Sequence, residues 1–494
     1  MVSWLVPVLF SYAIPALITL VVCLIVHEIP RITRKGLPPG PYGLPVVGYL
    51  PFLSKDAHRD MDRLRRQYGN VFGMFLGSRF VVGLCDFPTV KEALSQDALL
   101  NRPKDFPFAM NKESQGLMVV NGPLWREQRR FSLRLFKNLG VTTQTMEQHI
   151  HDELHHLLVE FKKCEGKPVV PTTYLTPSMS NIISALVFGK RFEYSDSERV
   201  YLDDLIETIP RLAAQMSSLL FFPWIRDLLL FFKVGSLEKL RHALVCREDF
   251  VDSKITTHME TFEDGTVRDY IDGFLTEMKQ DNSNPMFTRQ VLKGNGASFF
   301  GAGSETVRTA IDWLLLVSAA YPEVQLKVQA EIAEVVGPDG QVSWADSRRM
   351  PYTQAVIWEL LRWKPINPLN LLRHACVDVK VGDYTIPKGS IVIACLWSLF
   401  HNPEVTPDPE VFKPERHLTD NGGKFTKPEY LIPFSYGKRS CPGEVIAVME
   451  IFIYFTTLLQ HFDVSVPEGR SVNFNEVLGV SLRPVPQELV MRCR

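Results

Sequence analysis

Near its C-terminus the chain reads Phe434-Ser-Tyr-Gly437-Lys-Arg439-Ser-Cys441-Pro-Gly443-Glu, and an apolar helical run follows at once. A Cys441 thiolate would therefore lie at a helix N-terminus, where the helix dipole and free N–H groups stabilise an anion and lower the pKa of the thiol. Gly437 and Gly443 permit backbone geometry and close approaches that a Cβ would block. Arg439 offers a positive charge for an anionic group beside the thiolate. The segment therefore predicts a metal-ligating cysteine, the alternative being an inert buried cysteine after a turn.

This pattern, FxxGxRxCxG, is that of the cytochrome P450 family, which the chain resembles. All five fixed residues of the pattern are present, and chance gives on the order of 10⁻⁴ such matches in a chain of this length. The resemblance implies a mainly α-helical haem-thiolate fold with small β-sheet regions. It also implies haem b (iron protoporphyrin IX) as cofactor, with Cys441 as the metal ligand and the opposite coordination position open for dioxygen.

A second family motif, ExxR, is matched at Glu359-Leu-Leu-Arg362, where positions i and i+3 share one helix face. The same spacing occurs elsewhere in the chain, but the copy at Glu359 is accompanied by Phe412-Lys-Pro-Glu-Arg416, which resembles the family segment whose arginine completes a triad. His417 stands where the family usually has Phe. We expect Glu359, Arg362 and Arg416 to support the haem pocket and not to act in catalysis. The alternative is surface ion pairs, each worth under about 1 kcal/mol.

The stretch Ala302-Gly303-Ser-Glu305-Thr306 matches the family motif (A/G)Gx(D/E)T of the distal helix. By this resemblance Ala302 and Gly303 leave room for dioxygen, while a kinked turn lets the Thr306 hydroxyl and a water molecule pass protons. Glu305 and Thr306 are the expected catalytic residues. Val307 stands where the family usually has Thr or Ser, so the protons are delivered without a hydroxyl group at this position. A dinucleotide-binding glycine loop is the competing interpretation, but neither a third glycine nor a preceding strand supports it.

Haem carries two propionates that need cations, and the resemblance assigns partners to them. The stretch from Trp125 to Arg130 resembles the family's WxxxR helix. Together with the residues around the predicted ligand, the expected haem-binding set is Arg102, Trp125, Arg129, His374, Phe434, Arg439, Gly443 and Cys441. Arg126 and Arg130 form either a solvated charged face or, with Lys137 and Lys438, a basic docking surface for an electron donor.

The N-terminal end has no charged side chain over residues 1–26, and residues 4–26 would span about 34 Å as a helix. We predict a retained transmembrane anchor at residues 1–27. A cleaved signal peptide is the alternative, but it expects a shorter apolar stretch and a small-x-small cleavage site. Arg31, Arg34 and Lys35 follow the span, so the positive-inside rule places the rest of the chain in the cytosol.

Beyond the anchor, residues 28–48 are basic and rich in proline. Prolines fix φ and push the preceding residues into extended conformations, so we expect a stiff hinge; a plain linker is an alternative of similar weight. Long helical patterns and a few strand-like runs follow, with no repeat or Gly/Ser linker, which predicts one catalytic domain at residues 49–494. The helices are expected at residues 145–163, 237–258, 310–336 and 444–461, and strands at 79–84 and 390–396.

Composition and charge exclude several other classes of protein. With 46% hydrophobic and 22% charged residues, a net charge of -1 and 494 residues, the chain has an ordinary globular composition. This balance gives no electrostatic footprint for nucleic acid, and no nucleic-acid partner is expected. The eight cysteines lie far apart without a CxxC pair, which indicates neither a zinc ribbon nor a secreted disulfide framework.

One stretch, residues 219–232, departs from amphipathic order because it carries two Phe clusters and only two charges. Pro223 and the adjacent charges Arg226 and Asp227 make it too broken to span a bilayer. It is either buried core or a surface patch that dips into the membrane beside the anchor.

The resemblance extends over essentially the whole chain and is to animal microsomal members that oxidise drugs, steroids and lipids. It implies a monooxygenase of the endoplasmic reticulum membrane that inserts one oxygen atom into an apolar substrate, with electrons from NADPH through a reductase and with cytochrome b5 as a second candidate partner. The alternatives are a reductase-independent hydroperoxide or endoperoxide isomerase and a non-catalytic haem sensor or carrier. By family analogy, substrate contacts are expected from residues 106–116, 209–220, 299–306, 366–369 and 479–482.

Overall fold

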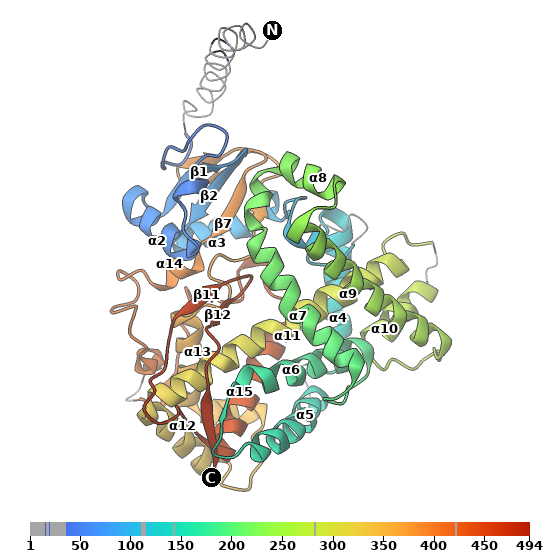
Figure 1. Cartoon of the computed structure of the whole chain (residues 1–494), viewed down its shortest axis with the longest axis vertical. Coiled ribbons are helices and arrows are strands. Elements are labelled where there is room, and N and C mark those ends of the chain that lie inside the picture. The colour runs from blue at the N-terminus through green and yellow to red at the C-terminus, as the bar shows by residue number, and fades with distance from the viewer. Residues whose placement is uncertain are drawn as a thin grey trace, which may run out of the picture.

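The computed structural model describes Pro15, Thr19 and residues 36–109, 115–141, 144–280, 283–419 and 422–494. The predicted anchor at residues 1–27, apart from Pro15 and Thr19, and the basic part of the hinge therefore lie outside the described residues. In the part that is described, the protein is mainly helical with several small sheets, as the sequence predicts (Figure 1).

The largest sheet lies at one end of the molecule and has the strand order β1-β2-β7-β4 (Figure 1). β1 (Val71–Leu76) and β2 (Arg79–Leu84) form a hairpin, and β2 pairs in parallel with β7 (Ile391–Ala394). β4 (Arg373–His374) completes the sheet as an antiparallel edge. The strand predicted at residues 79–84 is confirmed, whereas the one predicted at 390–396 ends earlier because α14 (Leu396–Phe400) begins there.

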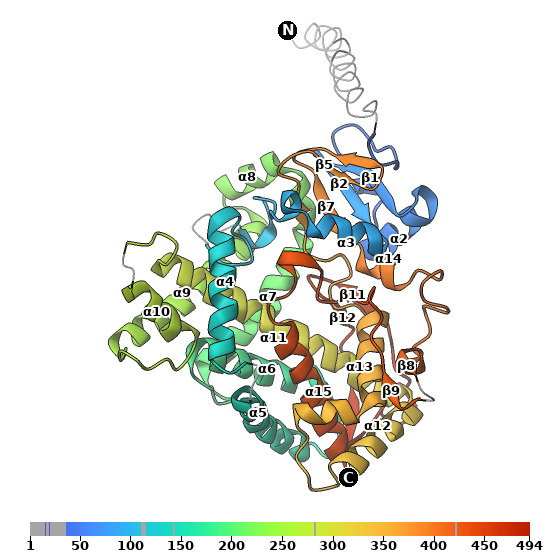
Figure 2. The same cartoon turned by 180° about the vertical axis from the view of Figure 1, so that it is seen from behind.

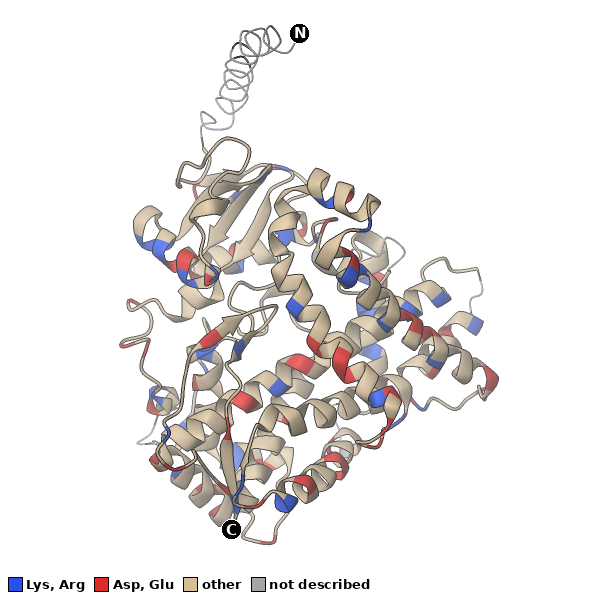
Figure 3. Ribbon diagram, viewed as in Figure 1, with Lys and Arg blue, Asp and Glu red and all other residues tan. Residues whose placement is uncertain are grey.

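The long helix α11 (Arg289–Ala320) runs through the middle of the molecule, and other helices pack around it (Figures 1 and 2). Its first turn is capped by Thr288, whose hydroxyl accepts a hydrogen bond from the Val291 N–H. α6 (Pro171–Phe188) lies along α11 and carries no charged residue. Lys and Arg are interspersed with Asp and Glu on the outer helices (Figure 3). Burial on most sides explains why α11 and α6 lack a strongly polar face.

The sequence predicts one helix at residues 310–336, but the structure divides this stretch into the end of α11 and α12 (Pro322–Val335). The break falls at Tyr321 because a proline disfavours the helical conformation of the residue before it and is well suited to the first turn of a new helix. The helices predicted at residues 145–163, 237–258 and 444–461 are confirmed as α5 (Gln144–Lys163), α9 (Gly235–Glu260) and α15 (Glu444–His461).

The remaining elements complete the helical body and its minor sheets. The other helices are α2 (Ala57–Tyr68), α3 (Phe87–Ser95), α4 (Gly122–Asn138), α7 (Ser197–Gln215), α8 (Pro223–Phe231), α10 (Tyr270–Gln280) and α13 (Pro351–Trp363). The minor sheets pair β10 (Phe462–Ser465) with β13 (Leu489–Cys493) and β3 (Pro168–Val169), β5 (Val379–Val381) with β6 (Tyr384–Ile386), β8 (Leu418–Thr419) with β9 (Lys424–Phe425), and β11 (Glu476–Leu478) with β12 (Leu482–Pro484).

Among the described residues, α15 is the one helix long and apolar enough to cross a membrane. Most of its side chains, including Phe452, Tyr454 and Leu458, are buried in the main hydrophobic cluster with α11, α13 and α5. α15 is therefore a core helix. Because its first residue, Glu444, follows the Cys441 loop directly, the packing of α15 in the core fixes the position of that loop.

The apolar stretch at residues 219–232 is partly buried core and partly exposed surface, which are the two alternatives that the sequence left open. Phe222 is buried against the β1–β2 hairpin, whereas Trp224, Phe231 and Phe232 on and after α8 are 61%, 78% and 63% exposed. α8 lies at the same end of the molecule as the hairpin (Figure 1), and Tyr42 of the hinge is exposed as well. We call Tyr42, Trp224, Phe231 and Phe232 the apolar end patch.

Candidate functional site

The loop that carries Cys441 is folded by short-range contacts that its sequence explains. The Cys441 N–H donates to the Phe434 carbonyl at 2.8 Å. Gly437 has φ of +75°, and a Cβ there would collide with the Leu94 carbonyl oxygen. Gly443 differs, because its φ is -99° and the nearest protein atoms to a Cβ there are ordinary contacts. The glycine at 437 is thus required by the backbone, while the one at 443 leaves free space beside the thiol.

The Cys441 side chain is surrounded by protein but exposed to an internal cavity. Burial raises the pKa of its thiol, against the N–H of Gly443 and the charge of Arg129, which both lower it. The direction is opposite to the one expected from a helix N-terminus, because desolvation outweighs these two favourable interactions. A thiolate here therefore needs a cation such as a metal ion to offset its burial.

The cavity has a volume of about 250 Å³ and joins the Cys441 loop to α11. Residues from both sides line it, so the predicted ligand and the predicted distal threonine share one space. The lining residues used below are Arg102, Trp125, Arg129, Ser298, Phe299, Ala302, Thr306, Ile366, Asn367, Phe434, Arg439 and Cys441.

Three buried arginines, Arg102, Arg373 and Arg439, and the partly buried Arg129 gather beside this cavity. The Arg439 guanidinium lies 4.1 Å from the centroid of the Trp125 ring and donates to three backbone carbonyls and one Asn side chain. Arg102 donates to two backbone carbonyls, both at 2.7 Å. Nε of Arg102 and both Nε and Nη1 of Arg373 are buried without a hydrogen-bond partner.

The electrostatics of this arginine cluster indicate a missing anion. Burial, together with repulsion from neighbouring arginines, lowers the pKa of Arg373 to about 10 and that of Arg439 to about 9. The pKa of Arg102 is lowered well below its usual value for the same two reasons. Among the described residues, no carboxylate forms an ion pair with any of the four. Two haem propionates would supply the charge and acceptors that these donors lack, so the cluster fits the implied cofactor.

The structure brings Arg373, which the sequence argument missed, into the arginine cluster in place of His374. Both residues belong to β4, where successive side chains point to opposite faces. Arg373 donates to the Arg439 carbonyl at 3.3 Å. The pKa of His374 is lowered by burial and by the charges of Arg79 and Lys104, and none of the four arginines of the cluster contributes to this shift. His374 is thus not placed with the predicted propionate partners, and the sequence offered no signal to separate the two, because a strand of two residues shows no periodicity.

On α11, Ala302 and Thr306 line the cavity, and the Thr306 hydroxyl donates to the Ala302 carbonyl at 3.0 Å. Gly303 does not serve the role expected of it: a Cβ there would come 2.9 Å from Ile183 on α6. Its small size therefore allows two helices to pack closely and does not leave room over the metal. The segment is continuous α-helix, without the expected interruption at this turn.

Glu305 is buried behind the cavity and accepts a hydrogen bond from the Ser481 hydroxyl at 2.6 Å. Burial raises the pKa of its carboxyl, although Ser481 and Arg483 act in the opposite direction. Arg483 donates to Glu207 at 3.1 Å, and Glu207 is also bound by Arg308 of α11. A chain of polar groups thus connects Glu305 with Glu207, whose side chain is partly exposed.

The predicted triad is present around Glu359: Glu359 and Arg362 are fully buried, and Arg416 is partly buried. Arg362 donates to both carboxylate oxygens at 2.8 Å, and Arg416 donates at 2.9 Å. His417 adds a fourth contact at 2.9 Å, so the departure from the usual Phe has a partner in this chain. Burial alone would raise the pKa of Glu359, but Arg362, His417 and the Lys413 N–H lower it to about 2. The group joins α13 to the segment Pro414–His417, and its role as a support for the haem pocket stays a prediction.

The basic residues proposed as a docking surface are mostly engaged in exposed ion pairs. Arg126 and Lys438 both pair with Asp97, and Arg130 pairs with Glu127. This arrangement favours a solvated charged face for these residues. The docking surface stays a prediction.

Only some of the segments that are expected to contact substrate line the cavity. Phe299 and Ile366 line it directly. Ile209, Leu212 and Ala213 belong to a separate apolar cluster between α7 and α9, which also contacts Phe108 and Val480. Leu220 belongs to the cluster around the β1–β2 hairpin. Residues 110–114 lie outside the described part of the chain.

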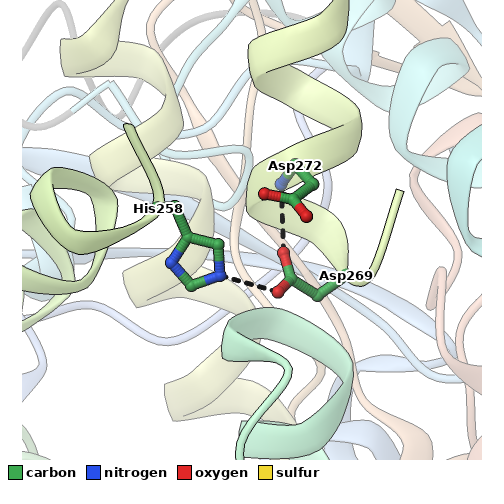
Figure 4. Close-up of side chains that lie close together, drawn as sticks. All are labelled: His258, Asp269 and Asp272. Atoms are coloured by element: carbon green, nitrogen blue, oxygen red, sulfur yellow. Dashed lines mark hydrogen bonds and ion pairs between the residues drawn. The ribbon is translucent and has the colours of Figure 1, made fainter. Parts of the chain in front are cut away.

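A second group of potential metal ligands, His258, Asp269 and Asp272, lies away from this cavity at the junction of α9 and α10 (Figure 4). His258 Nε2 faces Asp269 at 2.7 Å and its Nδ1 faces the Lys254 carbonyl at 2.7 Å. Both ring nitrogens thus face acceptors, and Asp272 is bound by Arg268. The group is an ion-pair network that joins two helices.

Comparison with known proteins agrees with this geometry. The family described as cytochrome P450 matches residues 38–491. Human cytochrome P450 2J2 is 36% identical over 466 residues, covering 92% of this chain and 91% of the relative. Cytochrome P450 2C20 of Macaca fascicularis is 35% identical, covering 89% and 90%, and cytochrome P450 2D28 of Mesocricetus auratus is 36% identical, covering 96% and 97%. The chain belongs to the cytochrome P450 family and is an oxidoreductase of the monooxygenase type.

Proposed function

We propose that this protein inserts one atom of dioxygen into an apolar small molecule, with haem b held by Cys441 and with the second oxygen atom released as water. The observation that carries the proposal is that Cys441 and Thr306 line one cavity with the unpaired arginine cluster beside it. Bound haem supplies the iron at which dioxygen is activated. Arg102, Arg129 and Arg373 would hold its propionates.

The roles of the protein's own residues follow from where they lie. The Thr306 hydroxyl reaches the cavity and can hold a water molecule and a proton there. Glu305 is within the same turn and is linked through Ser481 and Arg483 to the partly exposed Glu207. We infer that Glu305 replenishes protons from the outer side of α11. Apolar side chains such as Phe299 exclude bulk water from the space next to Thr306.

We propose that electrons come from NADPH through a separate flavoprotein reductase, with cytochrome b5 as a second candidate donor. We propose Arg126, Arg130, Lys137 and Lys438 as the basic docking surface for that partner, which would exchange its acidic groups for the present contacts with Asp97 and Glu127. A peroxide isomerase would need no such donor, and a sensor or carrier would need no hydroxyl over the metal. The position of Thr306 in the cavity favours the monooxygenase over both.

We further propose that residues 1–27 anchor the protein in the endoplasmic reticulum membrane, that residues 28–48 form the hinge, and that residues 49–494 form the cytosolic catalytic domain. The apolar end patch supports a second contact with the bilayer, since Trp224, Phe231 and Phe232 are exposed together on one end of the molecule.

Reconstitution of the full chain with haem, NADPH-dependent reductase and a panel of apolar substrates tests the proposal. Oxygenated products that require both NADPH and reductase are expected; products formed without reductase would establish the isomerase instead. The ligand is tested by Cys441→His, which should lose the thiolate signature of the reduced carbonyl complex, while Cys376→Ser and Cys395→Ser retain it. Persistence of that signature in the Cys441 variant would disprove the assignment.

A further inference from the structure

A second cavity lies at the end of the molecule that carries the apolar end patch. Its volume is about 520 Å³. It is bounded by the β1–β2 hairpin, the turn before β7 and the start of α8, which lie at one end of the molecule (Figures 1 and 2). Within the described part of the chain, its lining shares no residue with that of the Cys441 cavity. The lining residues used below are Leu37, Arg79, Pro223, Lys388 and Ser390.

The hinge places this second cavity close to the predicted anchor. Leu37 of the hinge belongs to the lining, and the residue before it is fixed to the body, because the Thr385 N–H donates to the Gly36 carbonyl at 2.9 Å. An extended chain spans at most about 3.6 Å per residue, so Gly36 is within about 32 Å of the end of the anchor predicted at residues 1–27. The cavity is therefore on the side of the molecule that the anchor would hold toward the bilayer.

The apolar end patch adjoins the same cavity. Pro223 lines the cavity and is followed directly by Trp224, which is 61% exposed. Phe231 and Phe232 at the other end of α8 are exposed as well. A molecule with its polar group in the cavity could therefore lay an apolar part along the patch.

The cavity carries more positive than negative charge. Arg79 of the hairpin and Lys388 of the turn before β7 both line it. Lys388 forms no ion pair with a described carboxylate. Arg79 pairs with Asp105, but Asp105 also accepts a hydrogen bond from Arg226 at 2.6 Å, and Arg226 pairs in addition with the exposed Asp227. Three cations thus share two carboxylates, which favours an anionic occupant.

The turn before β7 is held by its own main chain, which leaves its side chains available. Asp378 accepts a hydrogen bond from the Lys388 main-chain N–H at 2.7 Å, so it fixes the turn and not the ammonium group. Gly389 has φ of +88°, and its N–H donates to the Ala375 carbonyl at 2.8 Å. Ser390 is 2% exposed, and its Oγ is buried without a hydrogen-bond partner. Because a buried hydroxyl without a partner costs free energy, an acceptor on a ligand would stabilise this position.

We propose that this second cavity binds the phosphate of an anionic phospholipid, with Arg79 and Lys388 as its cations and with the acyl chains along the apolar end patch; the inference rests on the proposed contact of that patch with the bilayer. Guanidinium and ammonium groups both bind phosphate oxygens strongly. A zwitterionic headgroup carries its own cation beside the phosphate and gains less from the two residues. The contact would therefore favour bilayers that contain anionic lipids.

Titration calorimetry on the haem-loaded full chain in a neutral detergent tests this assignment, with soluble short-chain lipids as probes. Dihexanoyl phosphatidic acid should bind at least about 10-fold more tightly than dihexanoyl phosphatidylcholine, and also more tightly than inorganic phosphate, which lacks acyl chains. Arg79→Gln and Lys388→Gln should each weaken binding of the phosphatidic acid by about 10-fold, as expected for a charge-assisted hydrogen bond, and leave that of the phosphatidylcholine unchanged.

The matched control is Lys380→Gln on β5, because Lys380 is exposed and its replacement changes the net charge equally, but it does not line the cavity. This variant should bind both lipids as the unmodified protein does. An equal loss in the Lys380 and Lys388 variants would show a diffuse attraction without a site and would overturn the inference. Equal binding of the two lipids, or binding of inorganic phosphate as tight as that of the phosphatidic acid, would overturn it as well.

Failure of the proposed bilayer contact would give a different result. Trp224→Ser would then leave the binding of both lipids unchanged, while Lys388→Gln would still weaken that of the phosphatidic acid. Lys388 is exposed and has no described ion-pair partner, so its variant should fold with an unchanged melting temperature. The test therefore stays decisive even if Arg79→Gln is destabilised by the loss of its pair with Asp105.

Discussion

Glu305 and Thr306 are adjacent on α11, yet their side chains occupy different compartments. The Thr306 hydroxyl lies in the cavity, whereas the Glu305 carboxyl is buried behind it and accepts a hydrogen bond from Ser481 at 2.6 Å. The helix backbone therefore separates the group in the cavity from the group that is linked toward solvent. In the proposed mechanism, Thr306 uses protons in the cavity and Glu305 supplies them from the outer side.

The first prediction concerns Thr306→Ala. The variant should keep its haem content, bind substrate and consume NADPH, but the product formed per NADPH should fall by about 10-fold while hydrogen peroxide rises. General acid groups contribute roughly 10²- to 10⁴-fold, and water in the cavity recovers part of that loss. Ser304→Ala is the control, because its hydroxyl makes the same type of bond to the helix but is buried away from the cavity. Unchanged coupling in Thr306→Ala would show that the hydroxyl is only structural.

The second prediction separates Arg373 from its neighbour. Arg373→Leu should lower the haem content and the affinity for added haem, because it removes a cation whose Nε and Nη1 have no protein partner. His374→Leu should have little effect on either, since that side chain is directed to the other face of β4. Haem titration of the two purified variants measures the difference. Equal haem loss in both would contradict the role of the arginine cluster.

These two residues also show how far the sequence alone could lead. The Cys441 loop and the Glu359 group were predictable because local motifs with fixed spacing specify them. The choice between Arg373 and His374 was not, because a two-residue strand gives no periodicity from which its inner face can be read. The role of Gly303 depends on Ile183, which is distant in sequence and meets it only through helix packing. The cavity with Arg79 and Lys388 and the Glu305 network likewise arise from contacts between distant segments.

The third prediction concerns Glu359→Gln. Lowering its pKa from 4.5 to about 2 in the folded state corresponds to about 3 kcal/mol of stability. Because the folded-state value is the lower one, this stability is present above about pH 4.5 and is lost as the pH falls toward 2. Glu359→Gln should therefore reduce the free energy of unfolding strongly at pH 7 and progressively less in acid. Denaturant titrations across this range measure it.

The matched control for Glu359 is Glu415→Gln, which removes an exposed ion pair with Lys327. Its cost should stay under about 1 kcal/mol at pH 7. If the two variants lose equal stability, the buried triad is no more important than a surface pair.

The fourth prediction concerns His258, where both ring nitrogens face acceptors. Burial lowers the pKa of this imidazole, but the hydrogen bond and charge of Asp269 outweigh burial, so the pKa lies above its ordinary value of 6.5. A raised folded-state pKa means that the stabilisation is complete below about pH 6.5 and is lost as the pH rises past the folded-state value. His258→Gln should thus be most destabilising near pH 6 and less so near pH 9. A cost that does not change with pH would exclude the charged pair.

The last prediction tests the apolar end patch in a protein that lacks residues 1–35. This truncated protein should still bind membranes after carbonate washing, because each large apolar side chain that leaves water gains about 2 kcal/mol. Adding Trp224→Ser, Phe231→Ser and Phe232→Ser should release it in folded, haem-containing form, since these side chains are exposed and support no core. Phe222→Ser is the contrasting variant: it removes a side chain buried against the β1–β2 hairpin and should lower the melting temperature without releasing folded protein. If the triple variant stays bound, a different surface attaches the catalytic domain to the bilayer.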